Sequence, residues 1–347
     1  DFKINFVGMK GILEDNINYL TLDWKSRLRQ QEKSLKTEQD NTTIYYKFYQ
    51  TPDIDYFNEQ KDKKETIKTK LSWISFKQQF FCSSLIAKDY FINADLASTK
   101  STAIPTPGRS LKHMEATVAL SYDQGKSIDM KMYLGPNKYK ELRQYKMELE
   151  KQVPLGWSFF ILAWINRFAV IPVFDWLSGF NLNYGIIILL LTIGLKFVLF
   201  PIAYKTYLSS AKMRILKPEI DEIGLKFPKK EDALKKQQAT MGLYKKAGVN
   251  PMAGCLPMLL QLPILIAFFR FFPASIELRQ QSFLWATDLS SYDSIYNMPF
   301  TIPFYGDHVS LFCLLMTIST IIYTKLNNDA RYEDDDVFDA YYVPGVL

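Results

Sequence analysis

Histidine and cysteine are scarce in this sequence of 347 residues, which contains two histidines and three cysteines. Two histidines leave little material for a zinc site or for histidine-based catalysis. The cysteines are far apart, and two of them, Cys255 and Cys313, fall in apolar segments, so we interpret these as small buried residues rather than a disulfide framework. The sequence also lacks the P-loop, G-x-G-x-x-G and H-E-x-x-H motifs. These absences disfavour an ATP-driven transporter or a membrane protease, and we expect no cofactor and no metal.

Apolar residues are unevenly distributed along the chain. The first 150 residues are polar and rich in Lys, Asp, Tyr and Phe, whereas long apolar runs appear after residue 155. The net charge of +6 is mild and does not indicate a specific nucleic-acid partner. We therefore predict a soluble part joined to a membrane part. The chain opens with "DFKINFVG", which reads like a strand entered midway, so we expect the export signal of the first part to lie outside this sequence.

Residues 1–153 are predicted to form an extracytoplasmic, β-sandwich-like domain. Two segments alternate apolar and polar residues, which is typical of strands with one buried face. Their apolar positions are Met114, Ala116, Val118 and Leu120 in the first, and Ile128, Met130, Met132 and Leu134 in the second. The turn sequence "DQGK" between them predicts a hairpin. A charged helix is expected over 137–152, and no catalytic constellation is present in this half.

The segment 154–182 is predicted to be an amphipathic helix on the outer membrane surface. Its three tryptophans, at 157, 164 and 176, are of a type that favours the membrane–water interface. Polar residues and Pro172 interrupt it too often for a comfortable span. A true spanning helix is the alternative interpretation.

Residues 183–327 are predicted to be a helical transmembrane core. Three apolar stretches, 185–203, 255–272 and 308–324, are candidates for spanning helices, the last two at the short end of the ~17–25 residues that a bilayer requires. Between Lys205 and Lys246 the chain has eleven Lys/Arg against five Asp/Glu, and between Pro273 and Asp307 it has one against four. The positive-inside rule therefore places 205–250 in the cytoplasm and 273–307 outside.

The cytoplasmic stretch 208–250 is predicted to be a helical hairpin. Two segments with narrow apolar seams are separated by "KFPKK", which favours two antiparallel helices. Its basic face either meets anionic lipid or serves as a docking arm for cytoplasmic partners. The basic residues that would form this arm are Lys212, Arg214, Lys217, Lys245 and Lys246.

Polar side chains lie inside all three apolar stretches. A charged residue at bilayer depth costs at least ~2.5 kcal/mol, so Lys196 requires an explanation. It either snorkels to the interface or faces a water-filled cavity that is open to the cytoplasm. Threonines often bond back to their own helix, which is the alternative to a polar groove. The residues predicted to line such a groove are Lys196, Thr192, Gln261, Thr317 and Thr320, with Thr324 continuing the last stripe.

Four segments resemble the YidC family of bacterial membrane protein insertases, in the same order along the chain. They are "GWSFFILAWINRF" (156–168), "LSSAKMRILKPEIDEI" (208–223), "GVNPMAGCLPMLLQLPILIAFF" (248–269) and "ASIELRQQSFLWATDLS" (274–290). The resemblance covers about 156–327. It implies a large periplasmic domain and a five-helix core around a hydrophilic groove in the inner membrane.

The resemblance also implies a role for Lys196. The family carries a positive residue, usually arginine, in the groove on the first core helix, and Lys196 occupies the matching position, with Thr192 and Gln261 lining the same groove. Lysine keeps the charge but lacks the planar fork of arginine, so plain attraction is expected rather than bidentate contact. The anchor helix and the last core helices of the family are not recognised here, and the acidic tail 328–347 does not resemble the family.

The function that we expect is non-enzymatic: an insertase and chaperone for nascent inner-membrane proteins. The resemblance implies partners in the Sec translocon, the ribosome and membrane lipids. Two alternatives stay open at this point. One is a channel or transporter subunit with Lys196 as a counter-charge, and the other is a tethered extracytoplasmic enzyme, for which no acid–base or metal cluster is found.

Overall fold

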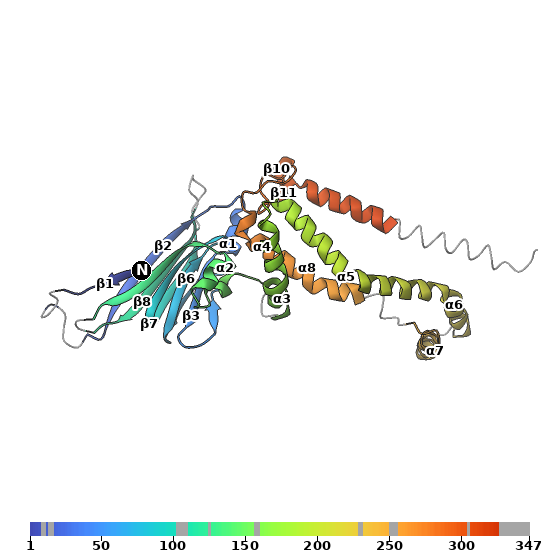
Figure 1. Ribbon diagram of the computed structural model, residues 1–347, viewed down its shortest axis with the longest axis horizontal. Helices are drawn as coiled ribbons and strands as arrows, with labels where there is room; N and C mark the ends of the chain where they lie inside the picture. Colours follow the sequence, from blue (N-terminus) through green and yellow to red (C-terminus); the bar gives the residue numbers. More distant parts are fainter. Residues whose placement is uncertain are drawn as a thin grey trace, which may run out of the picture. The chain divides into compact units, whose positions relative to one another are not determined.

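The computed structural model describes most of the chain. The described residues are 1–7, 12, 17–101, 110–123, 126–155, 160–227, 232–249, 256–303 and 306–325. They fall into two compact units, Asp1–Glu277 and Leu278–Leu347, and each unit is described by itself below. Figure 1 labels the elements.

The first unit begins with a β-rich part made of antiparallel strands. In chain order its elements are β1 (Phe2–Ile4), β2 (Tyr19–Arg29), α1 (Leu35–Asp40), β3 (Thr43–Phe48), β4 (Ile54–Tyr56), β5 (Lys63–Ile67), β6 (Leu71–Lys77), β7 (Phe81–Lys100), β8 (Ser110–Ser121), β9 (Ile128–Pro136), α2 (Tyr139–Gln144) and the 3-10 helix η1 (Leu149–Gln152). The long strand β7 organises the sheet. Its first half pairs with β6 and β9, and its second half pairs with β5 and β8.

The two halves of this sheet enclose one apolar core. Trp24 of β2 stacks on Phe76 of β6 with 3.8 Å between ring centroids, although β6 pairs with the first half of β7 and β2 pairs with β8, which adjoins the second half. The core also contains Ile44, Met114 and Val118, all fully buried. The β-rich fold is therefore confirmed. It is sandwich-like in that two packed layers share a core, but the layers are parts of one sheet joined through β7.

The predicted hairpin between the strands at 114–122 and 127–135 is wrong. Strand β8 pairs with β2 and β7, whereas β9 pairs with β1 and β7, so the two do not pair with each other. Each instead uses a different half of the same long neighbour. The alternation in β8 is correct, with its apolar face buried, but in β9 only Met130 is buried and Leu134 is exposed.

The predicted charged helix over 137–152 is also broken. It consists of the short helices α2 and η1, and the chain between them takes left-handed conformations at Lys146 (φ 53°) and Glu148 (φ 64°). Left-handed residues cannot continue a right-handed helix, so the two pieces change direction there. This change places the carbonyl of Met147 where the indole nitrogen of Trp73 donates to it at 2.9 Å.

The rest of the first unit is helical. Its elements are α3 (Phe160–Ile165), the π-helical turn η2 (Asn166–Val170), α4 (Ile171–Ser178), α5 (Tyr184–Ile215), α6 (Lys217–Lys226), α7 (Ala233–Lys246), α8 (Leu256–Ala274) and the 3-10 helix η5 (Ile276–Leu278), which crosses into the second unit. The segment predicted as one amphipathic helix is thus helical, with a π-turn at its centre. Trp164 and Trp176 are exposed, as an interfacial helix requires, and Trp157 lies outside the described residues.

The predicted cytoplasmic hairpin has a different first arm. Helix α5 does not end near residue 203 but runs on to Ile215, and α6 follows after Leu216. Helices α6 and α7 contact each other, and none of their described residues is fully buried. The predicted apolar seam of the first arm, Met213, Leu216, Ile220 and Ile223, is half-buried. In the seam predicted for the second arm, Leu234 and Met241 are exposed.

By length and composition, one helix in the described part of the chain can cross a membrane, at Tyr184–Met213. Only 11% of its apolar stretch is buried, unlike the core helix of a soluble protein. The stretches Gln261–Ala274 and Leu311–Lys325 are apolar but shorter.

The second unit contains the two-stranded sheet of β10 (Tyr296–Ile302) and β11 (Gly306–Val309), followed by the helix Leu311–Lys325. Figure 1 shows this sheet at the N-terminal end of that helix. The tail 328–347 lies outside the described residues.

Candidate functional site

Lys196 and Gln261 come together from different helices. Lys196 lies near the middle of α5 and Gln261 in the first half of α8, and Lys196 Nζ donates a hydrogen bond to Gln261 Oε1 at 3.4 Å. A charged donor favours this amide oxygen, although the distance is long for a strong hydrogen bond. Lys196 remains exposed, so its ammonium group has room for further partners. The two polar residues that the sequence places in a groove are thus in contact.

Proline residues remove backbone hydrogen-bond donors near this pair. Pro201 lies inside α5, five residues after Lys196, and Pro263 lies inside α8, two residues after Gln261. A proline in a helix removes the donor for the carbonyl four residues earlier, here Phe197 and Leu259. Such carbonyls need water or another partner at membrane depth. Side chains and backbone therefore both make this region polar.

The threonines are less available than the groove hypothesis requires. The hydroxyl of Thr192 donates to the carbonyl of Ile188 at 2.8 Å. In the second unit Thr317 and Thr320 donate to the carbonyls four residues before them, at 2.9 and 2.8 Å. Each hydroxyl therefore bonds back to its own helix, the alternative recognised from the sequence. Their oxygen atoms can still accept a hydrogen bond.

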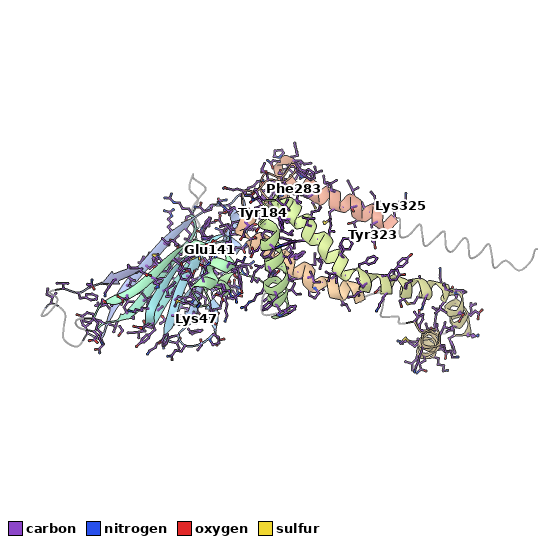
Figure 2. All side chains as sticks on the ribbon, in the orientation of Figure 1. Lys47, Glu141, Tyr184, Phe283, Tyr323 and Lys325 are labelled. Carbon is purple, nitrogen blue, oxygen red and sulfur yellow. The ribbon has the colours of Figure 1, made fainter. Side chains whose placement is uncertain are left out.

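The side chains around the Lys196–Gln261 pair are largely apolar and exposed. On α5 these are Ile193, Phe197, Val198 and Phe200, and on α8 they are Leu259, Leu262 and Leu265. Figure 2 shows side chains projecting outward along both helices. An exposed apolar surface of this kind is unfavourable in water and favourable in lipid. The ammonium group of Lys196 is therefore flanked by apolar side chains of both helices.

The basic residues of the predicted docking arm lie on exposed helices. Lys212 extends from the end of α5, and Lys245 and Lys246 end α7, where positive charges interact favourably with the helix dipole. Lys217 begins α6. The side chain of Arg214 lies outside the described residues. These four lysines are exposed, and their role as a docking arm stays a prediction.

Asn166 is a positioning residue that the sequence reasoning treated only as an interruption. It is fully buried in the π-turn, and its amide nitrogen donates to the carbonyls of Leu155 and Ala267, the latter at 3.0 Å. It therefore joins the segment before α3 to α8. A polar residue within an apolar run is the signal that could have indicated this role, because buried amides require partners.

The β-rich part also packs against α4 and α8. Lys140 of α2 forms an ion pair with Asp175 of α4 at 2.7 Å, and Lys138 pairs with Glu277 at 3.5 Å. Gln79 donates to the carbonyl of Pro273 at the end of α8. These contacts join the β-rich part to the helices.

Among the residues that the structure describes, no group of three or more His, Cys, Asp or Glu side chains could hold a metal ion.

Comparison with known proteins gives two adjoining family matches. Residues 15–167 match the YidC periplasmic domain, and residues 176–345 match the 60Kd inner membrane protein family. The chain is 46% identical over 340 residues to the membrane protein insertase YidC of Parabacteroides distasonis, an alignment that covers 94% of this chain and 53% of the relative. The chain belongs to the YidC family.

Other YidC insertases give the same result. The chain is 49% identical over 332 residues to that of Bacteroides fragilis, covering 93% of this chain and 53% of the relative. It is 39% identical over 332 residues to that of Amoebophilus asiaticus, covering 94% and 54%. The chain therefore spans about half the length of the curated relatives it matches.

The YidC match also bears on the acidic tail. The match to the 60Kd inner membrane protein family runs to residue 345 and so includes most of the tail 328–347. The expectation that this tail does not resemble the family is not supported.

Proposed function

We propose that this chain is part of an insertase that moves segments of nascent membrane proteins into the bacterial inner membrane without chemical catalysis. The observation that carries the proposal is the contact between Lys196 and Gln261 on two apolar helices. The names of the YidC relatives support the same activity.

The mechanism follows from the cost of placing charge in lipid. An acidic residue in a translocated flank costs ~2.5–3.5 kcal/mol at the bilayer centre. A cation at half depth, beside an amide and two proline-freed carbonyls, offsets part of that cost by attraction and by holding water. The exposed apolar surface of α5 and α8 then provides a path along which an apolar substrate segment leaves into lipid.

The arm formed by the end of α5 with α6 and α7 is proposed to receive the incoming chain. Its exposed lysines suit an acidic or phosphate-bearing surface, which both a ribosome and anionic lipid head groups provide. Cooperation with the Sec translocon belongs to the same proposal. We further propose a multi-pass topology, with residues 1–153 periplasmic and 205–250 cytoplasmic.

A charge series at position 196 tests the proposal. For a substrate with acidic residues in its translocated flank, Lys196→Arg should keep insertion near the native level. Lys196→Glu should lower it roughly tenfold, because a carboxylate would repel the flank with ~1–2 kcal/mol in a partly hydrated site. The matched control is Lys205→Glu, which changes an exposed lysine nine residues further along the same helix. Insertion is measured in vesicles that contain the full-length protein.

Site-specific photo-crosslinking from positions 192, 196 and 261 to a stalled nascent membrane protein locates the substrate. We expect crosslinks from all three positions. Gln261→Leu should weaken insertion less than Lys196→Glu, because it removes the partner of the ammonium group and keeps the charge. Normal insertion by Lys196→Glu, with no crosslink from position 196, would disprove the role of the lysine.

A further inference from the structure

The hairpin β10–β11 carries an apolar surface that the proposed insertase mechanism does not use. We propose that this hairpin lies in the outer leaflet of the bilayer and contacts lipid directly. The inference rests on the proposed function for one point, namely that helix Leu311–Lys325 enters the membrane from its N-terminal end.

The hairpin lacks charge where a water-exposed loop would have it. Residues 294–306 ("SIYNMPFTIPFYG") contain no Asp, Glu, Lys or Arg. Tyr296 and Phe300 are each 61% exposed, and Ile295 is 50% exposed. Monomeric soluble proteins rarely expose contiguous apolar surface of this kind, and it marks contact with lipid or another protein. Tyrosine in particular favours the level of the lipid head groups.

The hairpin is held firmly to the start of the helix. The carboxylate of Asp293 accepts hydrogen bonds from the backbone nitrogens of Leu311 and Phe312 at 2.8 and 3.1 Å, and also from the hydroxyl of Ser310. The indole of Trp285 donates to the same carboxylate at 3.1 Å and packs on Phe312 with 4.5 Å between ring centroids. Ile295 lies two residues after Asp293, and its backbone nitrogen donates to the carbonyl of Val309 at 3.0 Å, so the apolar surface begins close to the start of the helix.

The described part of the helix is shorter than the hydrocarbon core of a bilayer. At 1.5 Å per residue the described helix Leu311–Lys325 is about 22 Å long. The hydrocarbon core is ~30 Å thick, and mismatch has an energetic cost for each ångström left uncovered. An apolar hairpin at the outer end of the helix extends the apolar height of this unit.

The lack of positive charge indicates that the hairpin contacts lipid by burying apolar side chains rather than by attraction to anionic head groups. Between residues 280 and 324 the sequence contains no Lys or Arg. The binding of anionic lipid depends on such residues, so it cannot be what holds the hairpin. The hairpin has one carboxylate, Asp307, whose side chain is 65% exposed and therefore has to stay at head-group level. The expected depth is shallow and independent of lipid charge.

Fluorescence quenching in vesicles tests this placement with the full-length protein. A single cysteine carries an environment-sensitive fluorophore in a background with the three native cysteines replaced. The sites are Phe300→Cys in the hairpin, Ile318→Cys in the helix and Tyr56→Cys on the exposed β4 strand. Each is quenched in turn by iodide in water and by nitroxides placed at shallow and deep positions on the lipid chains.

We expect the label at position 300 to be quenched severalfold more by shallow nitroxides than the label at position 56, and to be protected from iodide. The result should be the same in zwitterionic vesicles and in vesicles with anionic lipid. Quenching by iodide at the level of position 56 would overturn the proposal. Protection from both quenchers would also overturn it, because the hairpin would then be covered by protein.

The label at position 318 shows whether a negative result at position 300 contradicts only the placement of the hairpin or also the proposed function. Lipid quenching at 318 without lipid quenching at 300 means that the helix is in the membrane and the hairpin is not. Absence of lipid quenching at both positions removes the membrane orientation itself, and with it the proposed insertase core.

Discussion

The β-rich part and the helical part of the first unit both place a lysine among apolar groups, and they treat it in opposite ways. In the β-rich part Lys112 is buried, and its ammonium group donates to the carbonyls of Thr42 and Glu59, the latter at 2.6 Å. Lys77 is also buried and donates to the carbonyl of Asn41. In the helical part Lys196 is exposed and has one long hydrogen bond to an amide.

The difference separates a structural lysine from one that is suited to a substrate. Lys77 and Lys112 donate to carbonyls just after α1, where the helix dipole favours a cation. Both side chains are almost completely buried, so little of either is open to a further partner. Lys196 projects from a helix whose neighbouring side chains are exposed, so a substrate, water or lipid can reach it. The apolar residues show a similar contrast, because those of the β-rich core cover one another whereas many on α5 and α8 are exposed.

The largest expected effect tests whether side-chain packing stabilises the β-rich part more than it stabilises α5. Trp73 is 0% exposed, whereas Phe197 of α5 is 73% exposed. Trp73→Ala should lower the free energy of unfolding of the β-rich part by ~3–5 kcal/mol, since it removes a large buried side chain and its hydrogen bond. Phe197→Ala should change stability by less than ~0.5 kcal/mol, because lipid replaces the lost contact. Pulse proteolysis of the full chain in lipid nanodiscs measures both.

If Phe197→Ala destabilised the protein as strongly as Trp73→Ala, the exposed surface of α5 would have to be covered by protein. The contrast between the two regions would then be wrong.

A smaller effect is expected at the start of the last described helix. In Asp293 burial opposes the charge, but the hydrogen bonds from Ser310, Phe312, Trp285 and Leu311 outweigh it and hold the pKa of this carboxyl below its ordinary value. Asp293→Ala should destabilise this end of the helix by ~1–2 kcal/mol, because the cap is lost. Faster proteolysis within 294–310 would report the loss. Asp307→Ala, which removes an exposed carboxylate from the same hairpin, should leave proteolysis unchanged.

A pH dependence is also expected of the β-rich part. Burial lowers the pKa of Lys77 from 10.5 to about 8, and burial likewise lowers the pKa of Lys112 to about 8. Between pH 8 and pH 10.5 these two lysines hold more protons in the unfolded chain than in the folded chain, so the free energy of unfolding should rise with pH. Burial raises the pKa of Tyr45 and of Tyr46, so above ~10 the unfolded chain loses protons first and stability should fall.

Chemical unfolding at a series of pH values, followed by the circular dichroism of the β-rich part, measures this maximum. Lys77→Met combined with Lys112→Met should flatten the rise and keep the fall. An unchanged rise in the double variant would show that other groups cause it.

Much of the fold was predictable because it depends on local periodicity. Alternation located β8 and its buried face, and apolar runs located α5, α8 and the helix at 311–325. The partners of the strands were not predictable. The turn "DQGK" favoured pairing of β8 with β9. Strand β7 is twenty residues long, however, and each of the two strands pairs with a different half of it. A short turn signal cannot outweigh a long strand whose pairing buries a common core.

The candidate site likewise has residues that the sequence could predict and residues that it could not. Lys196, Thr192 and Gln261 were recognisable as polar residues within apolar runs, because charge in such a run is costly wherever the chain folds. The roles of Asn166 and Asp293 were not recognisable. Their partners are 101 and 18 residues away at Ala267 and Leu311, and only the folded chain brings them within reach.

The sequence by itself determined where β8, β9 and the apolar helices lie, and that one of those helices carries a lysine. These properties follow from the order of side chains along a few turns or a few strand residues. The tertiary structure alone decided that β7 joins both layers of the sheet, that Lys196 meets Gln261 across 65 residues of sequence, and that the carboxylate of Asp293 caps a later helix. The physical reason is that such pairings depend on which distant surfaces can be buried together, a property of the whole chain that no local pattern contains.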